Sequence, residues 1–459
     1  MDLQVRPKMN ATFSTEIVVL LIIFLKFDHM TIRSFLAFLA LVNCLIACSQ
    51  TSIKQLSSLP VDRPDTYKGE NAKIKPAAER INVYLPLIKG KRVGIFANHT
   101  STVGKSHLVD TLLKLGVNVV VAFGPEHGFR GDMPDGVKIS DYNDEKTGVK
   151  VVSLYGSKRR PTLEDVKDVD VLIFDIQDVG TRFYTYISSM QEFLEFCLEN
   201  HKPLMILDRP NPNGYFVDGP VLDLKYKSFI GMQPIPINYG MTMAEYANML
   251  LGEKMLSAKA NEVNAYNITT NPTRDTAFHV QFIKNEGYTH KSRYTLPVAP
   301  SPNLPNMQAV YLYPSTCLFE GTSLSEGRGT DKQFQVFGHP DLPKNLFSFT
   351  PNPNAASRSS KNFGKVCYGW YIKGTPEEIL KQVDGKIQLK WLIEAYRLFP
   401  NKDSFFLKGN SFELRAGTDQ LRQQLKDGAS EEEIRKSWEP KLSEFKAVRK
   451  KYLLYEDFE

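Results

Sequence analysis

Residues 92–97 read RVGIFA and residues 117–123 read VNVVVAF, and residues 106–115 between them carry apolar side chains at helical spacing. The two apolar runs predict buried β-strands, and the segment between them predicts an amphipathic helix that ends at Gly116. Further apolar runs lie at residues 149–154, 169–174 and 203–207, and a further helical pattern lies at residues 185–200. Continuous apolar strands separated by helices are typical of a parallel sheet covered on both faces. The sequence therefore predicts an α/β fold whose first domain is a three-layer, Rossmann-like structure with a parallel sheet.

The sequence changes in character near residue 294. Its prolines at positions 297, 300, 302 and 305 crowd a stretch that cannot be helical and predict a linker or an ordered crossing loop. Strands are then expected at residues 309–313, 334–337 and 366–372, and helices at residues 375–382, 389–399, 418–426 and 430–453. We therefore expect a Rossmann-like domain over residues 76–296 and a smaller α+β domain over residues 297–459.

The composition and charge of the chain exclude several classes of protein. The 459 residues are 42% hydrophobic and 24% charged, which are ordinary values for a globular protein and exclude a disordered chain or a coiled coil. The formal net charge is +6 without a block of like charges, so no nucleic acid partner is expected. Five cysteines are too few and too scattered for a disulfide framework, and Cys197, Cys317 and Cys367 are expected to be buried.

The segment at residues 30–48 has the layout of a bacterial lipoprotein signal peptide. Arg33 supplies a positive charge, and residues 35–47 are almost wholly apolar. The run ends in Leu45-Ile46-Ala47-Cys48, which is similar to a lipobox, the motif in which a cysteine is lipidated. The sequence therefore predicts an exported lipoprotein.

The lipoprotein interpretation has consequences for the start and the location of the mature protein. We expect residues 49–75 to be a tether and the lipid on Cys48 to hold the protein at a membrane, facing the periplasm or the cell surface. Met30 is then an alternative to Met1 as the first residue. The competing interpretation is a short buried helix with a core cysteine.

The polar residues of the first half gather where the predicted strands end. In an open parallel sheet, ligands bind beyond the carboxyl ends of the strands. The candidate binding residues at these ends are Asn98, His99, His127, Arg130, Gln177, Arg182, Tyr184, Asp208, Arg209 and Asn211. These residues form four clusters, one after each of the predicted strands at residues 92–97, 117–123, 169–174 and 203–207. A single cluster is also typical of a solvated loop, but four clusters at one edge of a sheet indicate a functional site.

Two patterns for cofactors are incomplete. The segment Val103-Gly104-Lys105-Ser106 is similar to the end of a phosphate-binding loop, but that motif needs a glycine where this chain has His99. Histidines and carboxylates near the strand ends are candidate metal ligands, but no helix-spaced pair such as HExxH supports a metal site. We therefore expect no cofactor, and a metal-dependent hydrolase remains an alternative.

Carboxylates at the strand ends and in the second domain fit the chemistry of a glycosidase. Such an enzyme needs a carboxylic acid near the leaving oxygen and a second group as base or nucleophile. Glu126 is the candidate acid, because glycines flank its strand end and packing there can shield a carboxyl group from water. Its alternative role is a structural ion pair with Arg130 or Arg182. The second group remains open among Asp175, Asp178, Glu320 and Glu326, and the last two share a loop with Arg328.

Four longer motifs stand in order along the chain. They are GPEHGFRG at residues 124–131, FDIQDVGTRFYTY at residues 174–186, LDRPNP at residues 207–212 and FEGTSLSEGRGT at residues 319–330, with shorter motifs at residues 416–419 and 451–455. These motifs resemble those of the NamZ-type exo-β-N-acetylmuramidases, which are peptidoglycan hexosaminidases. The resemblance implies a Rossmann-like N-terminal domain, a smaller second domain that completes the cleft, and Glu126 as the catalytic residue.

The resemblance also implies a substrate. An enzyme of this kind releases terminal N-acetylmuramic acid from the non-reducing end of peptidoglycan-derived muropeptides or disaccharides. Muramic acid carries a lactyl carboxylate that N-acetylglucosamine lacks, and a guanidinium group is the best match for a carboxylate. We expect at least one of four arginines, Arg130, Arg182, Arg209 and Arg328, to bind it, with Arg182 and Arg328 favoured. A non-catalytic wall-binding lipoprotein is a further alternative.

Overall fold

The computed structural model describes residue 71 and residues 73–131, 140–270 and 280–459, which belong to one compact unit. The expected signal peptide, with Cys48, and most of the expected tether lie outside the described residues. Within the described part, no helix combines the length and the apolar composition needed to cross a bilayer.

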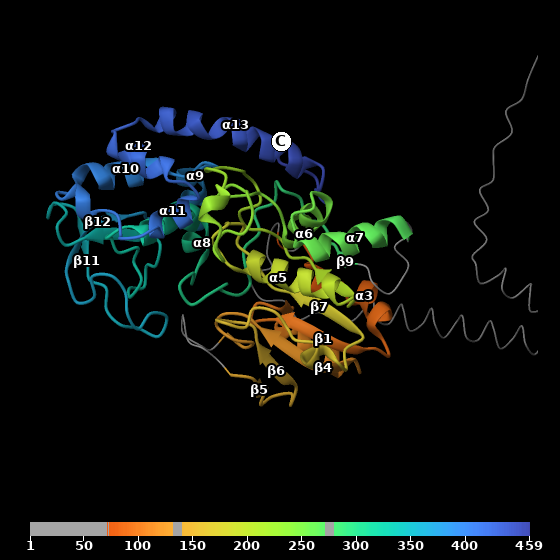
Figure 1. The fold of residues 1–459 in the computed structure, drawn as a ribbon. Helices are drawn as coiled ribbons and strands as arrows, with labels where there is room; N and C mark the ends of the chain where they lie inside the picture. The colour runs from red at the N-terminus through yellow and green to blue at the C-terminus, as the bar shows by residue number, and fades with distance from the viewer. Residues whose placement is uncertain (1–70, 72, 132–139, 271–279) are drawn as a thin grey trace, which may run out of the picture. The chain divides into compact units, whose positions relative to one another are not determined.

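A seven-stranded sheet forms the centre of the N-terminal part of the described chain (Figure 1). Its strands are β1 (Arg92–Ala97), β4 (Asn118–Gly124), β5 (Tyr142–Asn143), β6 (Lys150–Ser153), β7 (Val171–Asp175), β8 (Leu204–Leu207) and β9 (Val280–Ile283). They lie in the order β5-β6-β4-β1-β7-β8-β9, and all neighbours are parallel except the edge pair β5–β6. Without β5, the order of the described strands is the doubly wound order of the Rossmann fold. The predicted α/β fold with a parallel sheet is confirmed.

Helices cover this sheet and set the position of its crevice. They are α3 (Ile81–Ile88), α4 (Leu108–Lys114), α5 (Tyr186–Glu199), α6 (Met243–Gly252) and α7 (Ala258–Thr270), with short 3-10 helices η2 (Ala77–Glu79), η3 (Glu164–Val166) and η4 (Leu224–Tyr226). The connections through α4 and α5 run in opposite directions along the sheet, so right-handed crossovers place these helices on opposite faces. Helix α5 packs against α6 and α7 (Figure 1). The change of direction beside β1 leaves a crevice at the carboxyl ends of the strands.

The C-terminal part combines helices with a short antiparallel sheet. Its elements are α8 (Met307–Thr316), η5 (Cys317–Gly321), β10 (Val336–His339), β11 (Phe347–Phe349), β12 (Cys367–Tyr371), α9 (Pro376–Val383), α10 (Leu389–Leu398), η6 (Lys402–Ser404), α11 (Ser411–Ala416), α12 (Gln420–Lys426) and α13 (Glu431–Lys450). Strand β12 lies between β10 and β11. One cluster of buried apolar side chains runs from the central sheet through α8 to α13, so the two parts share a hydrophobic core.

Helix α8 lies where the sequence predicts a strand at residues 309–313, and that prediction is wrong. Asn306 caps the helix by accepting a hydrogen bond from the backbone N–H of Ala309 (2.9 Å). All residues from Ala309 to Thr316 are buried, so the segment has no polar face that would reveal a helical period. A short, fully buried run of β-branched and aromatic residues cannot be assigned to strand or helix by periodicity.

A second difference from the prediction concerns residues 102–107. Strands β2 (Thr102–Val103) and β3 (Ser106–His107) form a hairpin, and α4 begins at Leu108 rather than at Ser106. The ring of His107 caps α4 by accepting a hydrogen bond from the N–H of Val109 (3.2 Å). The Val-Gly-Lys-Ser segment is therefore a hairpin turn and does not lead directly into a helix, as a phosphate-binding loop does.

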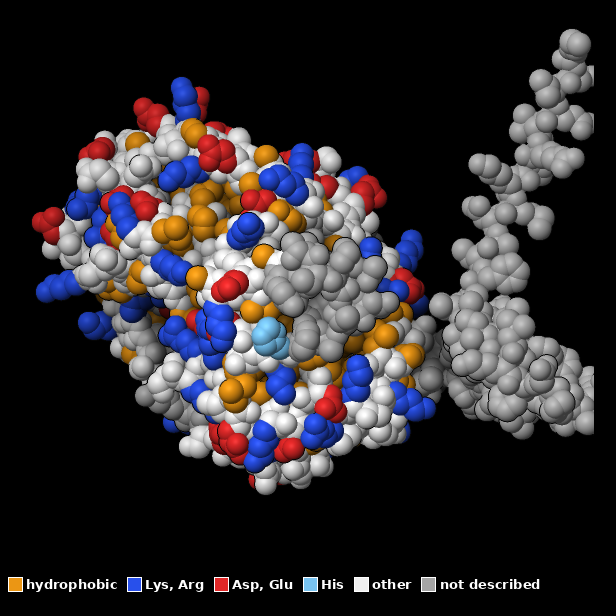
Figure 2. All heavy atoms as spheres, turned by 45° about the vertical axis from the view of Figure 1, so that its right-hand side comes forward, with side chains coloured by type: hydrophobic (Ala, Val, Ile, Leu, Met, Phe, Trp, Pro, Cys, Tyr) orange, Lys and Arg blue, Asp and Glu red, His pale blue; other side chains and the backbone are white. Residues whose placement is uncertain are grey.

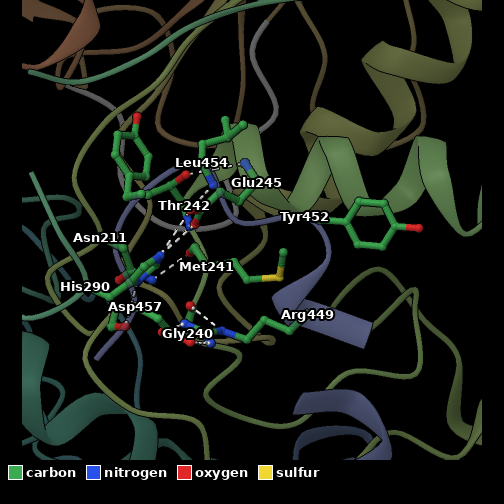
Figure 3. A network of polar contacts seen from close by, with 12 residues as sticks. Asn211, Gly240, Met241, Thr242, Glu245, His290, Arg449, Tyr452, Leu454 and Asp457 are labelled. Atoms are coloured by element: carbon green, nitrogen blue, oxygen red, sulfur yellow. Dashed lines mark hydrogen bonds and ion pairs between the residues drawn. The ribbon is translucent and has the colours of Figure 1, made fainter. Parts of the chain in front are cut away.

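The C-terminal end of the chain is tied to the N-terminal part by a buried polar network (Figure 3). Glu245 of α6 accepts a hydrogen bond from the N–H of Leu454 (2.8 Å) and pairs with His290 (3.0 Å), and the side chains of this pair are fully buried. Arg449, at the end of α13, is 1% exposed and donates to the carbonyl oxygen of Gly240 (2.8 Å). The end of α13 and the residues after it are thereby fixed to the segment that leads into α6.

The charges on the surface agree with the composition. On the face shown in Figure 2, Lys and Arg side chains are interspersed with Asp and Glu side chains over most of the area. This mixture fits the small net charge of +6.

Cys197, Cys317 and Cys367 are buried, which confirms the prediction from the sequence that these three cysteines are buried.

Candidate active site

A cavity of about 710 Å³ is lined by residues that follow β4 and β7 and by residues of the C-terminal part. The sheet side contributes Glu126, His127 and residues 183–186, the crossing loop contributes Ser301, Asn303 and Leu304, and the C-terminal side includes Glu320, Glu326, Arg328, residues 356–361 and Arg415. Six of the residues predicted from the sequence therefore meet at this cavity: Glu126, His127, Tyr184, Glu320, Glu326 and Arg328.

The turn after β4 holds Glu126 at the cavity. The N–H of Gly128 donates to the carbonyl oxygen of Pro125 (3.0 Å), which closes the turn. His127 within it has φ = +70°, a left-handed conformation that costs a non-glycine residue about 1–3 kcal/mol and that is concentrated at functional sites. Oε1 of Glu126 accepts a hydrogen bond from the Tyr155 hydroxyl (2.7 Å). The turn and this hydrogen bond orient a carboxyl group that lines the cavity.

Glu320 is held between two guanidinium groups on the other side of the cavity. Arg328 donates from Nη2 to Oε1 (2.9 Å), and Arg415 donates from Nε and Nη2 to Oε2 (2.9 and 2.6 Å). Burial alone would raise the pKa of the Glu320 carboxyl, but the two arginines lower it to about 2. Glu320 is therefore ionised at neutral pH and is a poor proton donor.

Glu326 is 3% exposed and also lies among cations. Nζ of Lys361 is 2.9 Å from its Oε2, and Nε of Arg328 is 3.4 Å from its Oε1. Lys361 is fixed in turn, because it donates to the carbonyl oxygens of Phe319 (2.7 Å) and Thr322 (2.9 Å). The C-terminal wall thus holds two carboxylates that are both surrounded by positive charge.

Three of the four arginines expected to bind a substrate carboxylate lie elsewhere. Arg130 pairs with Asp110 (2.8 Å) and Asp144 (2.7 Å). Arg209 forms a buried ion pair with Asp175, with Nε 2.6 Å from Oδ1.

Contrary to expectation, Arg182 is also internal. It has no exposed surface, and its terminal nitrogens donate to the carbonyl oxygens of Pro220 (3.0 Å), Ile235 (2.9 Å) and Arg415 (2.7 Å). Burial lowers its pKa to about 9. Arg182 therefore braces the structure. Neither Arg130 nor Arg182 pairs with Glu126, so the structure does not support the alternative in which Glu126 forms a structural ion pair with one of them.

Five further candidate binding residues brace the loops at the sheet edge and do not line this cavity. Two of them bond to tyrosine hydroxyl groups: Asn98 to Tyr186 (2.9 Å) and Asp208 to Tyr455 (2.7 Å). The other three bond to backbone carbonyl oxygens: His99 to Ala299 (2.9 Å), Gln177 to Pro210 (2.7 Å) and Asn211 to Met241 (2.8 Å). The strand ends therefore border the cavity, but most of the polar side chains there hold the loops in place.

Asp178, a candidate for the second catalytic group, is internal as well. It is 5% exposed and accepts hydrogen bonds from the Tyr239 hydroxyl (2.5 Å) and the N–H of Gly180 (2.6 Å). Burial raises its pKa to about 6 against the effect of these hydrogen bonds. It is not among the residues that line the cavity, which leaves Glu320 and Glu326 as the carboxylates that line it together with Glu126.

Two family models match the chain in succession. Residues 93–308 match the model described as exo-beta-N-acetylmuramidase NamZ, N-terminal, and residues 311–455 match the model described as exo-beta-N-acetylmuramidase NamZ, C-terminal. The chain belongs to this family. It is therefore an enzyme, a glycoside hydrolase. The peptidoglycan beta-N-acetylmuramidase NamZ of Bacillus subtilis (strain 168) is 37% identical over 421 residues, which cover 85% of this chain and 94% of that protein.

Solved structures of similar proteins support the same fold. A crystal structure of a DUF1343 family protein from Bacteroides fragilis NCTC 9343 is 44% identical, with a TM-score of 0.73. A second DUF1343 family protein from the same organism is 28% identical, with a TM-score of 0.67. Each comparison covers 84% of this chain and 99% of the other.

The two NamZ family models divide the cavity between them. The match to the N-terminal model includes Glu126, His127 and Tyr184. The match to the C-terminal model includes Glu320 and Glu326. The cavity of this family member is therefore complete only when both parts are present.

Three cations of the cavity are missed by sequence reasoning: Arg358, Lys361 and Arg415. Residues 356–361 read ASRSSK, which is typical of an ordinary solvated loop. Arg415 immediately precedes the AGTD motif at residues 416–419, and this proximity is the signal that could have found it. Arg358 differs from the others, because within the described residues its guanidinium group makes no ion pair or hydrogen bond.

Glu320→Gln should lower the thermal stability, because two partly buried arginines lose their carboxylate partner. The pKa of about 2 in the folded state lies below the ordinary value of 4.5, so the stabilisation is complete above pH 4.5 and is lost as the pH falls toward 2. At neutral pH it amounts to about 3 kcal/mol, at about 1.4 kcal/mol for each pKa unit. Melting temperatures of wild type and variant between pH 2.5 and 7 measure it.

The Tm difference should be largest near neutral pH and should shrink as the solution becomes acidic. Glu145→Gln, at an exposed position of the N-terminal part, is the matched control and should change Tm little at any pH. A Tm difference for Glu320→Gln that stays constant across this pH range would contradict a stabilising role for the ion pairs of Glu320 with Arg328 and Arg415.

Proposed function

We propose that this protein is an exo-β-N-acetylmuramidase that removes terminal N-acetylmuramic acid from the non-reducing end of peptidoglycan fragments. One observation carries the proposal: a cavity built from both family-matched parts is lined by the Glu126 carboxyl group and by the cations Arg328, Arg358, Lys361 and Arg415. The B. subtilis relative, named a peptidoglycan beta-N-acetylmuramidase, is matched over 94% of its length. Such an activity serves the turnover and recycling of cell-wall fragments.

In the proposed mechanism, Glu126 is the general acid and base. Its carboxyl group gives a proton to the glycosidic oxygen as the bond between that oxygen and C1 of the sugar breaks, while the second carboxylate forms a bond to C1. Glu126 then takes a proton from the water that displaces this carboxylate and releases the sugar. The Tyr155 hydroxyl supports this role by fixing one carboxyl oxygen, which orients the other. Glu326 is the proposed second carboxylate. Arginines donate hydrogen bonds to both oxygens of Glu320, whereas Oε2 of Glu326, although close to Lys361, accepts no hydrogen bond from the described residues.

Glu126→Gln should reduce kcat for a chromogenic N-acetylmuramic acid glycoside by about 100-fold or more. The substitution keeps the size and the hydrogen-bonding shape of the side chain while removing the proton that a general acid supplies. Steady-state kinetics measure the effect, and the melting temperature reports whether the variant folds. The matched control Glu145→Gln, at an exposed glutamate, should retain the wild-type rate.

If Glu126→Gln melts like the wild type and turns over at a near-normal rate, the catalytic role belongs to another group.

We further propose that Arg358 binds the lactyl carboxylate of muramic acid. The other cavity arginines already pair with carboxylates of the protein: Arg415 with Glu320, and Arg328 with Glu320 and Glu326. Arg358 lines the same cavity, and its guanidinium group is available for a bidentate contact with an added carboxylate. Arg328, one of the four arginines expected from the sequence, remains the second candidate for binding the lactyl carboxylate.

Arg358→Ala should raise KM for the N-acetylmuramic acid glycoside by about 10-fold or more with a smaller change in kcat, as the loss of uniform binding does. Arg358→Lys keeps the charge but not the bidentate geometry and should restore only part of the affinity. Lys344→Ala, at an exposed site in the C-terminal part, is the matched control. An unchanged KM for Arg358→Ala would return the role to Arg328.

Membrane anchoring through Cys48 is also proposed, on the strength of the Leu-Ile-Ala-Cys motif after an apolar run. Cys48→Ala should move the protein from the membrane fraction to the soluble fraction, because the lipid is the proposed anchor. Immunoblots of the two fractions measure this. Retention of the variant at the membrane would contradict lipidation at this residue.

A further inference from the structure

A second, smaller cavity of about 360 Å³ adjoins the main cavity at Glu126. Three residues line both cavities: Glu126, Thr185 and Ile230. The remaining lining of the smaller cavity comes from residues after β6, Ser189 of α5 and Phe229. The Glu126 carboxyl group therefore stands at the junction of two spaces rather than at the end of one.

We propose that this smaller cavity is the subsite for the leaving sugar, an N-acetylglucosamine residue, while the main cavity holds the muramic acid. The inference rests on the proposed function. A general acid of a glycosidase must stand beside the oxygen that joins two sugars, so one sugar lies on each side of it. A carboxyl group shared by two adjoining cavities meets this requirement. The volume of the smaller cavity is at the low end of the range for small-molecule sites, which suits a single sugar ring.

The charges decide which sugar occupies which cavity. Of the four cationic side chains in the main cavity, Arg328, Lys361 and Arg415 pair with Glu320 or Glu326. The fourth, Arg358, makes no ion pair within the described residues, so this cavity suits the sugar that carries a carboxylate. The smaller cavity has a single cation, Arg159, whose guanidinium carbon lies 4.1 Å from the ring centre of Phe229. A guanidinium stacked on an aromatic ring offers a flat surface with polar edges, which fits the neutral N-acetylglucosamine ring.

Tyr155 connects the smaller cavity to the acid. Its ring lines this cavity, and its hydroxyl group donates to Oε1 of Glu126 (2.7 Å). Thr185 and Ser189 supply hydroxyl groups to the same space, so the hydroxyl and amide groups of a sugar have partners there. A sugar bound in the smaller cavity therefore presents its bridging oxygen at the carboxyl group that protonates it.

Phe229→Ala tests the assignment with two substrates that differ only in the leaving group. The first is the disaccharide of N-acetylmuramic acid and N-acetylglucosamine, and the second is N-acetylmuramic acid β-fluoride, whose leaving group is too small to fill a subsite. The variant should lower kcat/KM for the disaccharide about 3- to 10-fold, the range expected for one lost aromatic contact. It should leave kcat/KM for the fluoride within about twofold of wild type, because the fluoride makes no contact with Phe229.

Three further variants keep the test decisive. Phe229→Tyr retains the ring and should restore turnover of the disaccharide, and Phe347→Ala removes an exposed ring from the C-terminal part and should affect neither substrate. Arg159→Ala repeats the test if Phe229→Ala does not fold. Equal losses on both substrates, or no loss on either, would overturn the subsite while leaving the proposed function intact. Failure of the wild type to hydrolyse either substrate would instead overturn the proposed function.

Discussion

The buried guanidinium group of Arg182 is the interaction on which the cavity depends. A buried cation is unfavourable unless it is hydrogen-bonded, and burial lowers the pKa of this one to about 9. Its hydrogen bond to the carbonyl oxygen of Arg415 ties α11 to the N-terminal part, and the side chain of Arg415 then holds Glu320. Gly417, with φ = +83°, allows this approach, because a Cβ atom there would lie 2.6 Å from Nη2 of Arg182. This chain of contacts sets the positions of Arg415 and Glu320 relative to the sheet edge.

The two sides of the cavity provide different environments for carboxyl groups. On the C-terminal side, arginines and a lysine surround Glu320 and Glu326, and the two arginines lower the pKa of Glu320 to about 2. On the sheet side, Glu126 is bound to a neutral tyrosine hydroxyl in a turn that contains the left-handed His127. A glycosidase needs carboxyl groups with separate roles, and environments of different polarity produce that separation.

The sequence predicts the sheet well because buried parallel strands are continuous apolar runs, and the runs at β1, β4, β6, β7 and β8 are all found. It fails at α8, where complete burial removes the helical period. For the site, the strand-end rule and the loop motif locate Glu126, Glu320 and Arg328. The rule cannot give the direction of a side chain, so Arg182 is in the predicted place but points inward. Arg358 reaches the cavity only through tertiary contacts, which no local pattern reports.

The most direct test of the account is the product pattern from a peptidoglycan tetrasaccharide with N-acetylmuramic acid at its non-reducing end. Mass spectrometry over a time course identifies which bond is cleaved first. The account predicts that free N-acetylmuramic acid and a trisaccharide appear together, and that the trisaccharide, which now ends in N-acetylglucosamine, stays intact. Internal cleavage to disaccharides, or release of N-acetylglucosamine from the new end, would contradict it.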